Sequence, residues 1–134
     1  MLGYKDIGLK YKDLWLFVGL CMVAFVVYSS LTSSPVTVDF KFSDKFLHIV
    51  GYFALMAWFI QIYHKKKSRI ILTIIFVAMG IGLEFLQDFG GIRYFEVADM
   101  VANTAGVLLA WSLAVTPLQN ILYGIESLLL RNKQ

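Results

Sequence analysis

Four long apolar segments dominate the sequence and restrict what the chain can fold into. They cover about residues 14–31, 43–63, 69–87 and 97–116. A helix rises about 1.5 Å per residue, so about 20 mostly apolar residues cross the hydrocarbon core of a bilayer. Hydrophobic residues make up 59% of the chain and charged residues only 16%, whereas soluble domains carry about 25% charged residues. The sequence therefore predicts an all-α polytopic membrane protein with four transmembrane helices, forming one domain over residues 1–134.

The segments at the two ends of the chain need separate interpretation. The first apolar segment is longer than the apolar region of a usual signal peptide, and no Ala-x-Ala site follows it, so we expect it to remain as a helix. Pro117 ends the fourth segment, and apolar residues then recur at spacings of three and four over residues 118–130. This amphipathic segment is too short to span a bilayer. We predict an interfacial helix, with packing back on the bundle as the alternative.

The distribution of lysine and arginine predicts the orientation. If the N-terminus is cytoplasmic, nine basic residues lie on the cytoplasmic side: Lys5, Lys10, Lys12, Lys65, Lys66, Lys67, Arg69, Arg131 and Lys133. The opposite side then holds Lys41, Lys45 and Arg93. Because cytoplasmic loops are enriched in lysine and arginine, both termini are expected in the cytoplasm. The basic residues form no continuous stripe, so no nucleic-acid binding is predicted.

The second apolar segment contains the first part of a candidate site. Asp44, His48 and Tyr52 are spaced four residues apart, so they form one polar stripe on a helix. Ionisable residues are costly inside a bilayer and are therefore functional candidates. In the structural alternative, Asp44 caps the helix and His48 is a satisfied packing residue.

The third and fourth segments place more polar groups at the same, extracytoplasmic end. Glu84 and Gln87 lie near the end of the third segment, and Asp99 and Asn103 lie near the start of the fourth. A glutamate inside a spanning helix needs a proton or a cation. The cations that can serve are His48, Lys45 and Arg93. Arginine has a planar guanidinium that suits a carboxylate or a phosphate. In the alternative interpretation, Asn103 only joins neighbouring helices through a hydrogen bond.

Three glycines and one cysteine also bear on how the helices pack. Gly80 and Gly82 precede Glu84, and Gly106 shares a helix face with Asp99 and Asn103. Small residues let helices approach closely, so Gly80 and Gly82 would admit another backbone, and we expect a structural role for Gly82 and Gly106. Cys21 is the single cysteine and lies in an apolar run, so no intramolecular disulfide is expected.

The ordered polar residues resemble the VanZ-like family of bacterial integral membrane proteins. The string SDKFLHIVGYFAL matches the family signature Asp-Lys-x-x-His-x-x-x-Tyr. The family order Glu-x-x-Gln, a loop arginine and Asp-x-x-x-Asn-x-x-Gly follows, so the similarity spans roughly residues 40–112. The family often has an acidic residue directly before the glutamate and Pro-Gly before the arginine. This chain has Leu83 and Gly91-Ile92 at those positions, which weakens any proposal that needs a second carboxylate beside the glutamate.

The resemblance implies a multi-pass protein of the bacterial cytoplasmic membrane. The family namesake is associated with resistance to the glycopeptide antibiotic teicoplanin, and similar proteins have no settled biochemical activity. We predict an outward-facing polar pocket that binds or processes a cell-envelope component, either a lipid headgroup or a lipid-linked glycan. The predicted binding residues are Asp44, Lys45, His48, Tyr52, Glu84, Gln87, Arg93, Asp99 and Asn103.

Two other functions stay open. The first is an intramembrane enzyme in which His48 acts with Asp44 or Glu84, as an acid–base pair or as metal ligands. The second is a structural bundle whose polar residues bind one another, although buried ion pairs often fail to recover their desolvation cost. Transport is disfavoured because the cytoplasmic halves of the helices are apolar. No cofactor and no resident metal are predicted, and membrane lipids are the expected partners.

Overall fold

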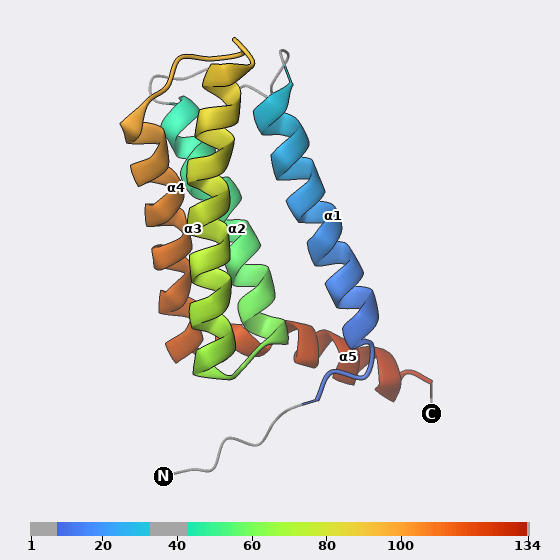
Figure 1. Cartoon of the computed structure of the whole chain (residues 1–134). Coiled ribbons are helices and arrows are strands. Elements are labelled where there is room, and N and C mark those ends of the chain that lie inside the picture. Colours follow the sequence, from blue (N-terminus) through green and yellow to red (C-terminus); the bar gives the residue numbers. More distant parts are fainter. Residues whose placement is uncertain (1–7, 33–42, 134) are drawn as a thin grey trace.

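The computed structural model describes residues 8–32 and 43–133 (Figure 1). These residues form α1 (Lys12–Leu31), α2 (Ser43–Ile62), α3 (Lys66–Phe89), α4 (Val97–Ala110), η1 (Trp111–Val115), η2 (Pro117–Asn120) and α5 (Ile121–Arg131), where η1 and η2 are 3₁₀ turns. Four helical stretches are long and apolar enough to cross a membrane, namely α1, α2, α3 and the continuous stretch of α4 and η1. The prediction of an all-helical chain with four such helices is therefore confirmed. Lys5 and Lys41, which entered the orientation argument, lie outside the described residues.

Two helix boundaries differ from the prediction. α3 begins at Lys66, so the basic run after His64 lies mostly in its first turn and not in the loop. The α-helical part of α4 ends at Ala110, and the chain continues as a 3₁₀ turn to Val115. Thr116 is extended, with φ −122° and ψ 161°. The residue before a proline is disfavoured in the helical region, so Pro117 explains why the helix cannot continue.

α2, α3 and α4 share the apolar core, while α1 stands to one side of them (Figure 1). Leu55, Met56 and Ile60 of α2 are fully buried, as are Val107 and Ala110 of α4. α2 is therefore the central helix of the group. Its side chains reach both α3 and α4, so most of the buried apolar area depends on its position.

The closest approach of α2 and α4 is at Gly106. A Cβ at this position would overlap the carbonyl oxygen of Ile49 and would lie 3.0 Å from the backbone nitrogen of Phe53. Both of these atoms belong to the α2 backbone, which cannot move aside as a flexible side chain can. The absence of a side chain at Gly106 therefore sets the separation of the two helices.

α1 contacts α2 through aromatic side chains as well as through the apolar side chains of Leu16, Met22, Val23 and Val26, which pack against the core. The indole N–H of Trp58 donates to the Trp15 carbonyl oxygen at 2.9 Å, and the two indole rings meet edge to face at 6.1 Å. A Cβ at Gly19 would lie 2.8 Å from the Phe59 ring, so this glycine admits the ring against α1. The rest of α1 is largely exposed.

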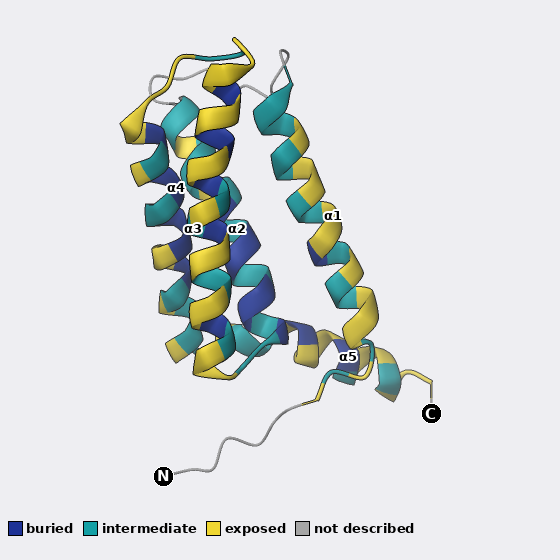
Figure 2. Cartoon of the chain, viewed as in Figure 1, coloured by how far each residue is buried: buried dark blue, intermediate teal, exposed yellow. Residues whose placement is uncertain are grey.

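Large apolar side chains cover the outer faces of the helices. Figure 2 shows exposed residues along α1 and along the outer sides of α3 and α4. They include Phe17, Phe25, Tyr28, Ile74, Val101 and Leu108. A water-soluble protein rarely exposes a continuous apolar surface of this extent.

α5 lies across the end of the bundle where α2 ends and α3 begins (Figure 1). Its buried face is formed by Leu122 and Glu126, whereas Ile125, Leu128 and Leu129 are exposed. The backbone N–H of Leu122 donates to Oε1 of Gln61 on α2 at 2.9 Å. One face of the helix therefore packs back on the bundle, and the remaining apolar side chains stay outside.

Glu126 joins α5 to the start of α1. Its carboxylate accepts the backbone N–H groups of Lys10 and Tyr11, each at 2.8 Å, and the indole N–H of Trp15 at 2.7 Å. Burial alone would raise the pKa of Glu126, but the donors of Tyr11, Trp15 and Lys10 lower it below the usual value of 4.5. The folded protein therefore favours the ionised carboxylate.

Because the pKa of Glu126 is lowered in the folded protein, the free energy of unfolding should depend on pH. The contribution of Glu126 is fully present above the pKa of the unfolded chain, about 4.5, and is lost as the pH falls below it through the lower folded pKa. We expect Glu126→Gln to lower the unfolding free energy at neutral pH by roughly 1–2 kcal/mol, because charge-assisted hydrogen bonds are lost. Thermal unfolding of both proteins in detergent at several pH values measures this effect. Parallel pH curves for the two proteins would contradict the prediction.

Candidate functional site

A cluster of charged and polar side chains lies where the first turns of α2 and α4 meet the loop between α3 and α4. It comprises Asp44, Lys45, His48, Arg93, Glu96, Asp99 and Asn103, and we call it the charged cluster. Asp44 lies in the first turn of α2 and Asp99 in the first turn of α4. A carboxylate is favourable there because the helix N-terminus carries a partial positive charge.

Asp99 is the buried centre of the charged cluster and is only 1% exposed. The Lys45 ammonium forms an ion pair with its Oδ1 atom. Its Oδ2 atom lies 3.6 Å from Nη2 of Arg93 and 3.8 Å from Nε2 of His48. Among the described residues, Oδ2 has no hydrogen-bond partner. A single carboxylate therefore has the cations Lys45 and Arg93 and the ring of His48 around it.

The outer part of the charged cluster is partly open to solvent. Nη2 of Arg93 donates to Oδ2 of Asp44 at 2.7 Å, with 28% and 43% of these side chains exposed. Lys45 also pairs with Glu96, whose side chain is 49% exposed. The hydrogen bond with Asp44 raises the pKa of Arg93 despite partial burial. Arg93 is therefore a permanent cation at the edge of the charged cluster.

His48 faces two carboxylates with one of its ring nitrogens. Its Nδ1 atom lies 2.7 Å from Oδ1 of Asn103, and because that oxygen only accepts, Nδ1 carries a proton. Nε2 lies 3.7 Å from Oδ1 of Asp44 and 3.8 Å from Oδ2 of Asp99. A proton or a cation between these three atoms would relieve the repulsion of their lone pairs.

The same three residues have the geometry of a metal site. Donor atoms of Asp44, His48 and Asp99 all lie within 4.8 Å of one another. Imidazole and carboxylate ligands suit several divalent metals. However, Lys45 and Arg93 already pair with these carboxylates, so a metal ion would have to displace them.

Glu84 and Gln87 of α3 are buried but bind neutral groups. Oε1 of Glu84 accepts the backbone N–H of Glu96 at 2.8 Å. The expected ion pair of Glu84 with a cation is absent from the described contacts, so the loop backbone replaces it. Nε2 of Gln87 donates to the carbonyl oxygen of Ser30 at 2.6 Å and thereby links α3 to the end of α1. Gln87 lies near the charged cluster but serves helix packing.

Tyr52 also differs from the prediction. It is 3% exposed and belongs to the apolar core, and its hydroxyl has no hydrogen-bond partner among the described residues. Along the polar stripe on α2, the described hydrogen bonds therefore involve Asp44 and His48, and the role of Tyr52 stays a prediction. The Tyr52 ring instead fills space below the charged cluster.

The two predicted structural glycines have different surroundings. Gly106 lies against the α2 backbone, as described above, but a Cβ at Gly82 would meet nothing within 4 Å. Of the two α3 glycines expected to admit a neighbour, Gly80 does so, because a Cβ there would be 3.1 Å from Asn103 and 3.4 Å from Tyr52. Gly80 therefore makes room for Asn103 to reach His48.

Glu96 belongs to the charged cluster although it is not among the residues predicted from the sequence. It contributes through both its carboxylate, which pairs with Lys45, and its backbone N–H, which binds Glu84. Its position three residues before Asp99 is the signal that points to it, because residues at this spacing lie near each other at a helix start.

Comparisons with known proteins give one relative. The chain is 29% identical over 125 residues to the uncharacterized protein C11E3.10 of the fission yeast Schizosaccharomyces pombe, covering 90% of this chain and 70% of the relative. No family model matches the chain. No solved structure is similar to it. The relative shows that a chain of similar sequence occurs in a eukaryote.

Proposed function

We propose that the chain is a VanZ-like integral membrane protein whose charged cluster binds the phosphate-bearing headgroup of a membrane lipid or a lipid-linked glycan. The four apolar helices and their exposed apolar faces support a membrane location. The observation that carries the binding proposal is the partly exposed pair of Arg93 and Asp44, beside the buried carboxylate of Asp99.

A ligand can bind at the outer edge of the charged cluster by replacing one of the carboxylates that pair with the cations there. Asp99 keeps Lys45 and Arg93 in position from below, so both cations remain when an outer carboxylate moves away. A phosphate can then replace Asp44 on Arg93 and form two parallel hydrogen bonds with the guanidinium. The released carboxylates of Asp44 and Glu96 can accept an amino or hydroxyl group of the same headgroup.

The position in the bundle also favours a headgroup. The charged cluster lies at the ends of helices that match the thickness of a bilayer core, which is the depth of lipid phosphates. A phosphate-bearing headgroup is common to bacterial and fungal membranes, so this chemistry also accommodates the fission yeast relative. The bacterial cytoplasmic membrane, the orientation and the link to glycopeptide resistance stay predictions of the sequence.

The test measures how much phosphatidylethanolamine the purified protein retains in native mass spectrometry. Arg93→Gln should weaken retention about tenfold or more, since a charge-assisted pair contributes roughly 1.5–3 kcal/mol. Arg131→Gln, at the exposed end of α5, is the matched control and should behave as the unaltered protein. Diacylglycerol, which lacks the phosphate, should be retained poorly. Equal retention by the two variants, or equal retention of the two lipids, would overturn the proposal.

The second candidate is the intramembrane enzyme or metal site, and the grouping of Asp44, His48 and Asp99 favours it. His48 would then act through Nε2, as a metal ligand or as the proton acceptor. Glu84, an alternative partner in the sequence-based hypothesis, is outside this group. Elemental analysis of the same preparations separates the candidates. About one divalent ion per chain that is lost in His48→Ala supports the metal site, and a value near zero removes it.

A further inference from the structure

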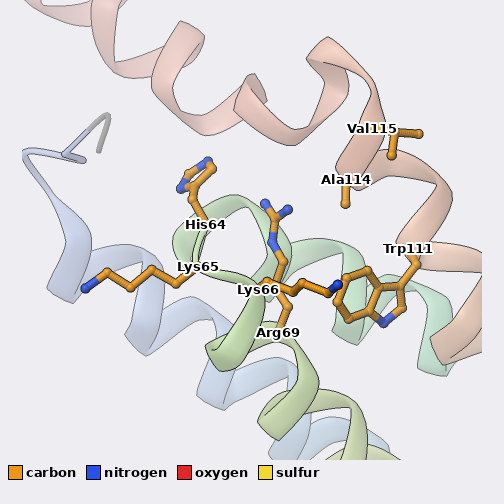
Figure 3. A pocket seen from close by; sticks show the side chains of 7 residues that line it. All are labelled: His64, Lys65, Lys66, Arg69, Trp111, Ala114 and Val115. Atoms are coloured by element: carbon orange, nitrogen blue, oxygen red, sulfur yellow. The ribbon is translucent and has the colours of Figure 1, made fainter. Parts of the chain in front are cut away.

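A cavity of about 550 Å³ lies at the other end of the bundle from the charged cluster. It is formed by the turn between α2 and α3, the first turn of α3, and η1 (Figure 3). Its lining residues are His64, Lys65, Lys66, Arg69, Trp111, Ala114 and Val115, and we call it the basic pocket. Three of these seven residues are lysine or arginine and none of the seven is acidic, so the lining carries a net positive charge.

Arg69 forms the fixed part of the basic pocket. It is only 4% exposed, and its guanidinium donates to the carbonyl oxygens of Tyr63 and Ile60, each at 2.8 Å, and to Oε1 of Gln119 at 3.0 Å. These three acceptors are neutral oxygens. The bonds therefore hold the guanidinium in one orientation at the wall of the pocket.

The lysines of the basic pocket lie at the start of α3. Lys65 is the N-cap residue and makes no capping hydrogen bond with its side chain, and Lys66 is the first helical residue. The partial positive charge of a helix N-terminus adds to the charge of these side chains. Figure 3 shows that Lys66 extends toward Trp111 while Lys65 extends the opposite way. The two ammonium groups therefore point away from each other.

The opposite wall of the basic pocket is apolar. Trp111 is fixed because its indole N–H donates to Oγ1 of Thr73 at 2.8 Å. Ala114 and Val115 continue this wall along η1, and the Val115 side chain is highly exposed. A ligand that fits this lining carries an anionic group beside the lysines and an apolar part along Trp111 and Val115.

We propose that the basic pocket binds the phosphate of an anionic phospholipid, with the acyl region along Trp111 and η1. Basic pockets between membrane helices on the cytoplasmic side bind anionic headgroups, and the sequence predicts this end of the bundle to be cytoplasmic. The proposal needs the membrane location of the chain but not the binding function of the charged cluster, which lies at the other end of the helices.

The test compares two variants of adjacent lysines in native mass spectrometry with phosphatidylglycerol. The double variant Lys65→Gln and Lys66→Gln should lose about 25-fold in phosphatidylglycerol retention, about fivefold for each basic residue near an anionic lipid. Lys67→Gln is the matched control, because Lys67 lies in the same helical turn but does not line the pocket. All three positions are exposed, so the substitutions leave the core intact.

Two further measurements show whether the bound phosphate belongs to a lipid or is a free anion. Phosphatidylcholine should be retained much more weakly than phosphatidylglycerol, and inorganic phosphate should compete only weakly if the lipid is the ligand. If inorganic phosphate competes strongly with the lipid, and if this competition is lost in the double variant, the basic pocket still binds phosphate. Its ligand is then a free anion and not a lipid. The comparison is repeated in the Arg93→Gln background, so that lipid bound at the charged cluster does not mask the result, and the difference between the double variant and Lys67→Gln should persist there. Equal phosphatidylglycerol retention by the double variant and Lys67→Gln would overturn the proposal.

Discussion

Replacing Gly106 with alanine is expected to lower the free energy of unfolding by about 2 kcal/mol or more. The added methyl group would overlap the carbonyl oxygen of Ile49 and approach the backbone nitrogen of Phe53. Because both atoms are backbone, α2 and α4 must separate to admit the methyl group, and overpacking of this kind costs about 1–3 kcal/mol or more. The separation would also loosen the contact of Val107 and Ala110 with the core.

Gly82→Ala is the matched control for this prediction. Both glycines are helical, but a Cβ at Gly82 meets nothing within 4 Å. Alanine favours a helix over glycine by about 1 kcal/mol, so the control should be neutral or slightly stabilising. Unfolding by sodium dodecyl sulfate, followed by circular dichroism, measures both variants. Equal effects at the two positions would show that the close approach at Gly106 does not limit stability.

Removing the carboxylate of Asp99 is expected to have the largest effect at the charged cluster. Asp99 is 1% exposed and pairs with Lys45 and Arg93. Loss of one partner of a fully buried ion pair costs about 3–5 kcal/mol. The cost here should be smaller, because Lys45 and Arg93 are partly exposed and keep Glu96 and Asp44 as partners. We therefore expect Asp99→Ala to lower the unfolding free energy by about 2–3 kcal/mol, the loss of a charge-assisted hydrogen bond at a buried group. Asp99→Asn keeps the shape of the side chain and separates the loss of charge from the loss of volume.

Glu96 provides the comparison because it pairs with the same lysine. Its side chain is half exposed, and exposed ion pairs contribute about 0–1 kcal/mol. Glu96→Gln keeps the backbone N–H that binds Glu84, so less than about 1 kcal/mol should be lost. Both variants can be measured in one denaturation series in detergent. If Glu96→Gln were as destabilising as Asp99→Ala, Asp99 would not be the centre of the charged cluster.

The helices and one part of the charged cluster could be predicted from the sequence. The length of an apolar run sets how far a helix extends, and the spacing of four residues puts Asp44 and His48 on one face. The pairing of these residues with Asp99 and Asn103 then follows because α2 and α4 run parallel and both begin at this end of the bundle. Periodicity thus carries information about which side of a helix is polar.

The partners of the α3 side chains could not be predicted in this way. Glu84 binds a backbone N–H in the loop, and Gln87 binds the last turn of α1, so both depend on parts of the chain without a periodic pattern. The choice between Gly80 and Gly82 depends on helix rotation, because two residues turn the direction by about 200°. A sequence spacing alone does not fix that rotation.

α5 shows a different limit of sequence patterns. Its apolar residues recur at helical spacing, but the face that meets the bundle contains Glu126 beside Leu122. Three N–H donors from the start of α1 compensate for burial of the carboxylate. These donors are far away in the sequence, so the local spacing of apolar residues does not indicate that Glu126 is buried.

The long-range bond of Glu126 bears on how the chain is made in the cell. Tyr11 and Glu126 are separated by 115 positions, so almost the whole polypeptide has to leave the ribosome before this contact forms. The first helix is made early in synthesis, but the backbone N–H groups at its start acquire their acceptor only when the last helix has been made. A ribosome that stops before Glu126 therefore releases a product whose four long helices are complete but whose first helix lacks this contact at its N-terminal end.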